Sequence, residues 1–171
     1  TTNQVLSNID SALIDNYFYT DISRFFLKNA KNKFNKHLNA LHFDLININE
    51  LDEFNKFERG KFDIIIASNV LHLAENIEQT LDNIISLLNS NGLILLNEGV
   101  LKRHFATMIF GFTDGWWEHQ NGHWNISGCP LISTQNWLQL LKKKGFKYAS
   151  SLNRLSGLDE TKAGQDVLLA I

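Results

Sequence analysis

Short apolar runs alternate with amphipathic segments along most of the chain. The runs FDIIIA (62–67) and LILLN (93–97) are almost wholly apolar, which is typical of strands buried on both faces of a sheet. Between them, residues 75–90 place apolar side chains at the spacing of one helical face. Gly92 follows this segment and is expected to end the helix. The pattern therefore predicts a strand–helix–strand unit.

The same alternation continues on both sides of this unit. The other expected elements are a strand at 16–20, a helix at 23–34, a strand at 40–43, a weakly helical polar segment through 57, a helix at 136–146, and strands at 146–152 and 166–171. Strands that alternate with helices form a mostly parallel sheet with helices on both faces, so the predicted fold class is α/β. Ligands of such sheets bind beyond the carboxyl ends of the strands.

Composition and charge exclude several functional classes. A chain of 171 residues suits one domain with a sizeable core, and its formal net charge of −2 offers no basic field to nucleic acid or an anionic membrane. No apolar stretch approaches the roughly 20 residues that span a bilayer, and TTNQVLSNID lacks the features of a signal peptide. The one cysteine, Cys129, cannot form an intrachain disulfide, which fits a reducing compartment. We expect a cytoplasmic protein without nucleic-acid or membrane partners.

Polar residues follow the predicted strands at the edge where ligands bind. They are Asp21, Asp44, the segment Ser68 to His72, and Glu98. FDIIIA and LILLN are joined by one helix, and a right-handed crossover makes them neighbours that end on the same edge. His72 and Glu98 are then expected within reach of each other, as a general base oriented by a carboxylate. The alternative is that His72 caps a helix start and Glu98 is a solvated acid.

Two aspartates at the same edge are candidates for cofactor binding. Asp21 stands between a strand and a helix, where an acid can accept hydrogen bonds from both hydroxyls of a ribose. The alternative is that Asp21 or Ser23 caps the next helix, and both roles are compatible. Asp44, in HFDL, can accept a hydrogen bond from an adenine amine or can be an ordinary turn aspartate.

Six segments, in this order, carry a resemblance to a known family. They are YFYTDIS, FDIIIASNVLH, SLLNSNGLILLNEG, FGFTDGWW, PLISTQNWLQLLKKKGF and GQDVLLA. The most specific part is the combination of SNVLH, the glutamate on the next strand and GWW before the last helix. Together they resemble the S-adenosylmethionine-dependent methyltransferase domain of polyketide synthases, and most closely its carbon-methylating type. The resemblance runs from about residue 1 to residue 171.

The resemblance implies a Rossmann-like class I methyltransferase fold that binds S-adenosylmethionine. The implied cofactor-binding residues are Asp21, Ile22, Asp44, Leu45, Ser68 and Asn69. By similarity, Asp21 matches the acid that binds the ribose, and Asp44 with Leu45 matches the adenine side. Ser68 and Asn69 match the loop beside the methionine end of the cofactor.

The resemblance also implies the chemistry. His72 and Glu98 match the family's catalytic dyad: His72 removes the proton between the two carbonyls of a β-ketoacyl thioester, and Glu98 holds His72. The resulting enolate attacks the sulfonium methyl. The acyl chain is expected on the phosphopantetheine arm of an acyl carrier protein, beside neighbouring polyketide synthase domains. The alternatives are O-methylation of a polyketide hydroxyl and a non-catalytic, structural methyltransferase domain of a megasynthase.

A segment at about 104–130, rich in Trp, Phe and Gly, is expected to form a lid insertion over the acyl chain. Phe110, Trp116, Trp117 and Trp124 are the candidate substrate-binding residues. The alternative is that the tryptophans only attach the lid to the core.

No metal site is expected in this segment. His119 and His123 have a spacing that can bind zinc on a helix, and His104 precedes them, but EHQNGHW is a glycine-containing loop without a nearby cysteine or acid cluster. The lysine run 142–144 is expected to be a solvated helix end, and the alternative is contact with an acidic carrier protein.

The N-terminal end departs from the family pattern. TTNQVLSNID resembles the helix that follows the family's first strand and glycine-rich loop, entered part-way. The missing strand normally lies between the strand ending at Thr20 and the strand ending at Ala67, and a gap there leaves backbone groups unpaired at a high cost. We therefore expect that the chain is a fragment of a longer polypeptide, or that another chain supplies the strand.

Overall fold

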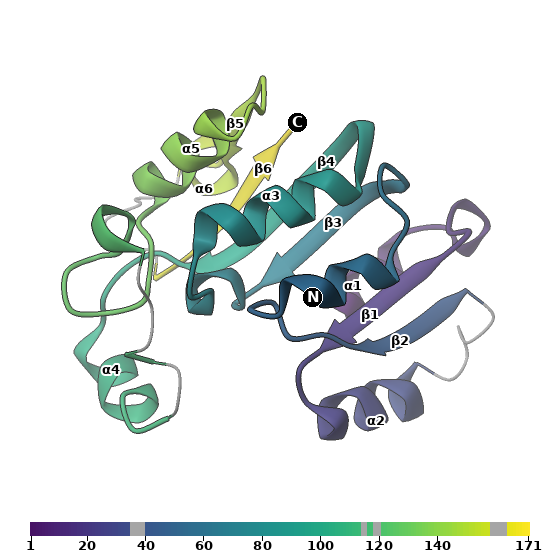
Figure 1. Cartoon of the computed structure of the whole chain (residues 1–171), viewed down its shortest axis with the longest axis horizontal. Helices are drawn as coiled ribbons and strands as arrows, with labels where there is room; N and C mark the ends of the chain where they lie inside the picture. The colour runs from purple at the N-terminus through teal and green to yellow at the C-terminus, as the bar shows by residue number, and fades with distance from the viewer. Residues whose placement is uncertain (35–39, 114–115, 118–120, 158–163) are drawn as a thin grey trace. The chain divides into compact units, whose positions relative to one another are not determined.

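Figure 1 shows the computed structural model, which describes residues 1–34, 40–113, 116–117, 121–157 and 164–171. The chain divides into two compact units, Thr1–Glu53 and Phe54–Ile171. The single domain that the sequence predicts, with its lid at about 104–130, stays a prediction. Among the described residues, no helix is long and apolar enough to cross a lipid bilayer.

The first unit is built on one pair of parallel strands. Its elements are α1 (Thr2–Asn8), a 3-10 helix at Ser11–Leu13, β1 (Tyr17–Asp21), α2 (Arg24–Lys33) and β2 (Leu41–Leu45), and a second 3-10 helix at Leu51–Lys56 crosses into the other unit. In the strand pair, Tyr17 lies opposite Leu41 and Asp21 lies opposite Leu45. Helix α2 contacts both strands, and Ala30 packs with Leu41 in a small buried cluster. The strand–helix–strand order predicted for this region is confirmed.

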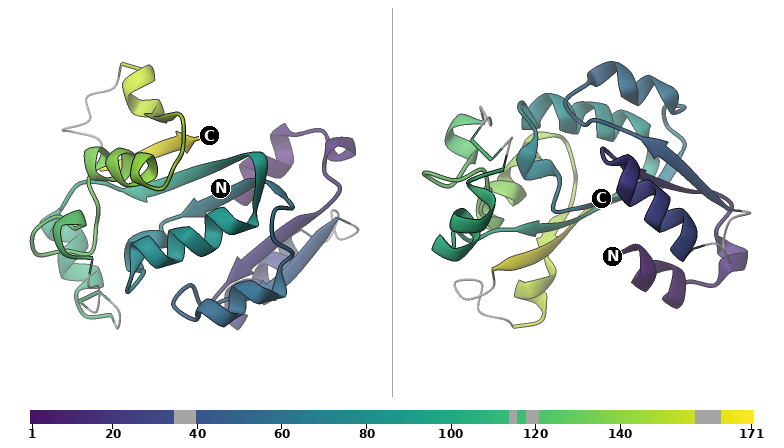
Figure 2. Two further views of the ribbon diagram at one scale, coloured as in Figure 1. Left: turned by 45° about the horizontal axis from the view of Figure 1, so that its top comes forward. Right: turned by 90° about the horizontal axis from the view of Figure 1, so that it is seen from below.

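The second unit is a four-stranded mixed sheet with helices. Its elements are β3 (Phe62–Ser68), α3 (Ile77–Leu87), β4 (Leu88–Gly99), α4 (His104–Phe110), α5 (Thr134–Lys143), β5 (Ala149–Ser151), α6 (Leu152–Leu155) and β6 (Gln165–Ala170), with 3-10 helices at Leu71–Leu73 and Gly122–Trp124. The strand order is β3-β4-β6-β5. Figure 2 shows α3 alongside β4. The sheet core is formed by residues such as Ile94, Leu96 and Leu168, which are fully buried.

The sheet of the second unit is less parallel than the sequence predicts. β3 and β4 are parallel, as expected, but β6 runs antiparallel to both β4 and β5. β5 and α6 lead the chain to the edge where β4 ends, and β6 starts from that edge, so it must run back. As a result the start of β6 lies beside the end of β4, with Gln165 opposite Gly99.

Two local expectations were wrong. Gly92 does not end a helix: α3 ends at Leu87, and Gly92 lies inside β4. A Cβ on Gly92 would lie 3.0 Å from the Phe62 carbonyl oxygen, so the close approach of β3 explains the glycine. β3 is not buried on both faces either, since Ile64 is 47% exposed at an edge strand of this sheet.

β1 and β3 are each edge strands of their sheets as far as the described residues show. Among the described residues, β1 pairs only with β2, and β3 pairs only with β4. The additional strand that the family resemblance implies therefore stays a prediction.

Candidate active site

His72 and Glu98 come together at the carboxyl ends of β3 and β4. β3 and β4 end in register, with Ser68 opposite Asn97. His72 follows β3 in a 3-10 helix and is 7% exposed, and Glu98 is near the end of β4 and is fully buried. Nδ1 of His72 lies 2.5 Å from Oε2 of Glu98. The predicted proximity of the two side chains is confirmed, and the alternative of a solvated Glu98 is wrong.

The Glu98 carboxylate is satisfied by three hydrogen bonds. Oε2 accepts from the imidazole of His72, and Oε1 accepts from the backbone N–H groups of Val70 and Leu71, both at 3.0 Å. A buried carboxylate needs such donors, because it has lost its hydration. When Nδ1–H donates to Glu98, Nε2 of the neutral imidazole becomes the acceptor, which is the tautomer required of a base at Nε2.

The loop that presents His72 begins with an unusual backbone conformation. Asn69 has a φ of 50°, in the left-handed region that asparagine tolerates better than most residues. Its N–H donates to the Asn97 carbonyl at 2.8 Å and so extends the β3–β4 ladder by one bond. The turn after Asn69 then lets the amides of Val70 and Leu71 reach Glu98.

The side chains of Ser68 and Asn69 are also held at this edge of the sheet. Nδ2 of Asn97 donates to Oγ of Ser68 at 3.0 Å, and Nε2 of Gln165 donates to Oδ1 of Asn69 at 2.7 Å. Ser68, the last residue of β3, and Asn69 therefore lead directly into the turn that carries His72. Gln165 was not predicted, because only the antiparallel return of β6 places it there.

The other predicted cofactor residues lie at the carboxyl ends of β1 and β2. Asp21 and Asp44 are half-buried, and Ile22 is exposed. Asp21 lies opposite Leu45, so the predicted residues of β1 and those of β2 lie at the same end of this strand pair. The capping alternative is realised, because Oδ1 of Asp21 accepts from the Ser23 N–H at 2.8 Å and Ser23 is the N-cap of α2, while the cofactor role of Asp21 stays a prediction.

Comparison with known proteins places the chain in a family. The family model described as "Methyltransferase domain" matches residues 2–94, which is more than half of the chain. The chain belongs to this methyltransferase family. It is 35% identical over 157 residues to the polyketide synthase PksR of Bacillus subtilis, which covers 92% of this chain and 6% of PksR. The chain therefore spans a small part of the length of this relative.

Solved structures agree with this assignment. The CurJ carbon methyltransferase matches with a TM-score of 0.88 and 28% identity over 99% of this chain and 44% of the CurJ chain. The trans-methyltransferase CalH, solved in complex with SAH, matches with a TM-score of 0.73 and 26% identity over 91% of this chain and 42% of the CalH chain. The expected α/β class I methyltransferase fold and the use of S-adenosylmethionine are confirmed.

The residues of this methyltransferase fit S-adenosylmethionine chemically. The carboxylates of Asp21 and Asp44 are acceptors of the kind that ribose hydroxyls and an adenine amine need. The hydroxyl of Ser68 and the amide of Asn69 supply donors and acceptors of the kind that an amino-acid end needs. Within the described ranges, no group of His, Cys, Asp and Glu side chains could hold a metal ion. His119, one of the histidines considered above, lies outside those ranges.

The aromatic residues of the expected lid fall into two groups. Trp116 is buried with Cys129 and Leu131, and Phe110 stacks on it with ring centroids 5.7 Å apart. Burial also raises the pKa of the Cys129 thiol, which disfavours the reactive thiolate. Trp117 is half-exposed and donates from its indole nitrogen to the Gly111 carbonyl at 2.9 Å.

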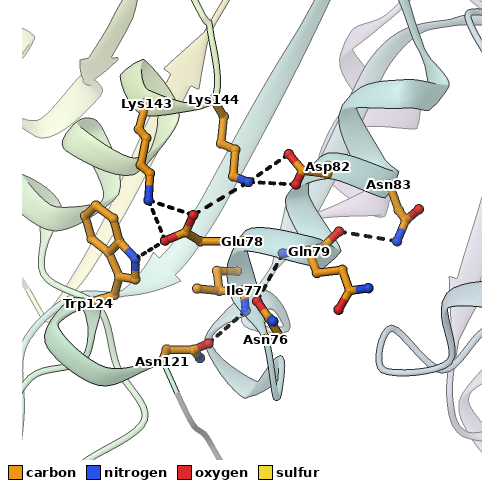
Figure 3. Close-up of polar contacts among 10 residues, drawn as sticks. All are labelled: Asn76, Ile77, Glu78, Gln79, Asp82, Asn83, Asn121, Trp124, Lys143 and Lys144. Carbon is orange, nitrogen blue, oxygen red and sulfur yellow. Dashed lines mark hydrogen bonds and ion pairs between the residues drawn. The ribbon is translucent and has the colours of Figure 1, made fainter.

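Trp124 belongs to a polar network that joins α3 to α5 (Figure 3). Its indole nitrogen donates to Oε1 of Glu78 at 2.9 Å, and the Lys143 ammonium binds both carboxylate oxygens of Glu78 at 2.8 Å. Lys144 binds both carboxylate oxygens of Asp82 at the same distance. The expectation of a solvated lysine run was therefore wrong for Lys144, whose side chain is 11% exposed, whereas Lys143 is paired but exposed. Trp124 attaches this segment to the core, and a substrate contact from it stays a prediction.

Asn121 strengthens the same attachment. Its Oδ1 accepts from the Ile77 N–H and its Nδ2 donates to the Ala74 carbonyl, each at 2.8 Å. Both atoms of this buried amide are thus used at the start of α3. Sequence pattern alone does not reveal Asn121 or Glu78, because each is an ordinary polar residue until the fold brings its partners close.

We predict that Glu98→Ala destabilises the protein much more than Glu98→Gln. Alanine leaves the part-buried amide of Val70 and the buried amide of Leu71 without an acceptor, at a cost of about 2–5 kcal/mol in the free energy of unfolding. Glutamine keeps a carbonyl oxygen at this position. The Glu98→Gln variant should therefore lose less than half as much free energy of unfolding as Glu98→Ala. Urea unfolding of the two variants checks this, and equal losses would contradict the role of Glu98 as acceptor for the loop.

The Glu78 network predicts a pH dependence. Hydrogen bonds from Lys143 and then from Trp124 lower the pKa of the Glu78 carboxyl from its usual value of 4.5. Its contribution to stability is therefore present above pH 4.5 and lost as the pH falls through the lower folded-state pKa. Between about pH 6 and about pH 3, wild type should lose more free energy of unfolding than Glu78→Gln does.

A control for this experiment is Glu58→Gln, which changes an exposed carboxylate paired with Lys61 at 3.3 Å. This variant should follow the wild-type pH dependence closely, because exposed ion pairs contribute little. Parallel pH curves for wild type and Glu78→Gln would contradict the predicted role of the network.

Proposed function

We propose that this methyltransferase methylates the α-carbon of a β-ketoacyl thioester during polyketide biosynthesis. The observation that carries the proposal is the buried pair of His72 and Glu98, 2.5 Å apart. The similarity to the CurJ carbon methyltransferase and to the polyketide synthase PksR supports the carbon atom as the acceptor and the polyketide as the substrate class.

In this proposal His72 is the general base. The α-hydrogen between two carbonyls is acidic enough for an imidazole to remove, and its electron pair passes into the enolate. Nε2 of His72 takes the proton while Nδ1–H remains on Glu98, whose negative charge stabilises the imidazolium that forms. S-adenosylmethionine, when bound, supplies the electrophilic methyl group that the enolate carbon attacks.

The amides of Val70 and Leu71 have a defined part in this step. They hold Oε1 of Glu98, so that Oε2 stays on the imidazole rather than rotating away. A base oriented before the substrate arrives loses little entropy in the reaction. Glu98 therefore acts through His72 as a positioning residue.

The cofactor would be held by the residues that the family resemblance implies. Asp21 would bind the ribose hydroxyls with Ile22 beside it, and Asp44 with Leu45 would bind the adenine. Ser68 and Asn69 would bind the amino-acid end, and their side chains are held by Asn97 and Gln165 just before His72.

The acyl chain would be delivered by an acyl carrier protein and covered by the lid. Phe110 and Trp117 are the exposed members of the predicted substrate-binding set, whereas Trp116 and Trp124 are buried. We therefore expect the first two to contact the acyl chain and the other two to hold the lid in place. Neighbouring polyketide synthase domains and a cytoplasmic location are part of this proposal, the latter because the single cysteine fits a reducing compartment.

The proposal is tested by incubating the natural protein with S-adenosylmethionine and a short β-ketoacyl thioester. Mass spectrometry should show the gain of one methylene, placed on the α-carbon by fragmentation. His72→Ala should lower the rate by about 10²–10⁴-fold, the usual contribution of a general base. His42→Ala removes an exposed histidine from β2 and should leave the rate unchanged.

Other results would point to the alternatives. Methylation that persists in His72→Ala would remove His72 from its role as base. Methylation of β-hydroxyacyl thioesters alone would indicate an O-methyltransferase. No methylation of either substrate by a protein that is folded would indicate the structural, non-catalytic domain.

A further inference from the structure

Gln165 connects β6 to the loop that carries His72, although 96 residues separate it from Asn69. It is the first residue of β6, and its Nε2 donates to Oδ1 of Asn69 at 2.7 Å. Asn69 follows β3, and β4 lies between β3 and β6 in the sheet. The Gln165 side chain therefore reaches across the end of β4 to the loop. Its exposure indicates that the fold does not depend on this contact.

The backbone and the side chain of Asn69 are fixed by different partners. Its backbone is held in the left-handed conformation, with a φ of 50°, by the bond from its N–H to the Asn97 carbonyl. That bond leaves the carboxamide group free to rotate about its side-chain torsions. The hydrogen bond from Gln165 removes this freedom, because it directs the acceptor oxygen of the amide towards β6.

The orientation of the amide decides what Asn69 offers to a ligand. A carboxamide has one acceptor oxygen and one NH₂ donor on opposite sides. Because Oδ1 faces Gln165, the Nδ2 donor is directed away from it. A donor in this position suits an anionic group, and the amino-acid end of S-adenosylmethionine carries a carboxylate.

We propose that Gln165 is a positioning residue for the cofactor: it orients the Asn69 amide so that Nδ2 donates to the carboxylate of S-adenosylmethionine. This inference rests on the place of Asn69 in the cofactor site of the proposed function. It adds a residue of β6 to a site otherwise assigned to the ends of the parallel strands. The inference concerns cofactor binding and does not depend on which atom of the substrate is methylated.

The experiment compares two ligands on the natural protein by isothermal titration calorimetry. S-adenosylhomocysteine carries the carboxylate, and 5′-methylthioadenosine has the same adenosine and sulfur without the amino-acid end. Gln165→Met keeps the length of the side chain and removes its donor. It should weaken S-adenosylhomocysteine binding about tenfold, the usual effect of one hydrogen bond to a charged group, and change methylthioadenosine binding less than about twofold.

Two further variants separate positioning from a general structural effect. Gln139→Met makes the same chemical change at an exposed position of α5 and should leave both affinities unchanged. Asn69→Gly keeps the left-handed backbone and removes the amide. In that background Gln165→Met should cause no additional loss, because the two residues would act through one contact.

Three results would overturn the inference. The first is unchanged S-adenosylhomocysteine binding in Gln165→Met, and the second is an equal loss of affinity for both ligands. The third is a loss in Gln165→Met that persists when Asn69 is already glycine. Wild type that binds S-adenosylhomocysteine but does not methylate a β-ketoacyl thioester would refute the proposed function and leave this inference standing.

Discussion

The candidate active site depends on one buried carboxylate. Glu98 is fully buried at the end of β4, and a carboxylate in that position must be surrounded by donors or the fold loses several kcal/mol. The donors are two consecutive backbone amides, those of Val70 and Leu71, and the imidazole of His72. The same requirement therefore shapes the loop after β3 and orients the histidine. The need of Glu98 for donors thus explains both the conformation of the loop and the orientation of the proposed base.

Successive side chains of β4 point to opposite faces of the sheet, so Asn97 and Glu98 contact the end of β3 and the following loop from different faces. Asn97 points to the less buried face and binds Ser68, while Glu98 points to the core face and binds the following residues. On the core face, Asp166 of β6 lies opposite Glu98. The hydroxyls of Thr134 and Ser151 donate to Asp166, so each of the neighbouring acids has its own donors.

Sequence reasoning located the central elements because their signals are local. The apolar runs at 62–67 and 93–97 marked β3 and β4, and the handedness of a crossover was enough to bring His72 near Glu98. The position of Gly92 was misjudged because its close neighbour, Phe62, comes from another strand. Gln165 was missed for a similar reason: its role arises from the antiparallel direction of β6, which no local pattern encodes.

The most direct measurement is the ¹⁵N NMR spectrum of the His72 imidazole in the natural protein. We predict that the neutral ring carries its proton on Nδ1, hydrogen-bonded to Glu98, and that Nε2 is unprotonated. In Glu98→Gln this preference should weaken, while the spectrum of the exposed His42 should not change. A neutral His72 with its proton on Nε2 in the wild-type protein would contradict the proposed role of His72, because that nitrogen could not then serve as the base.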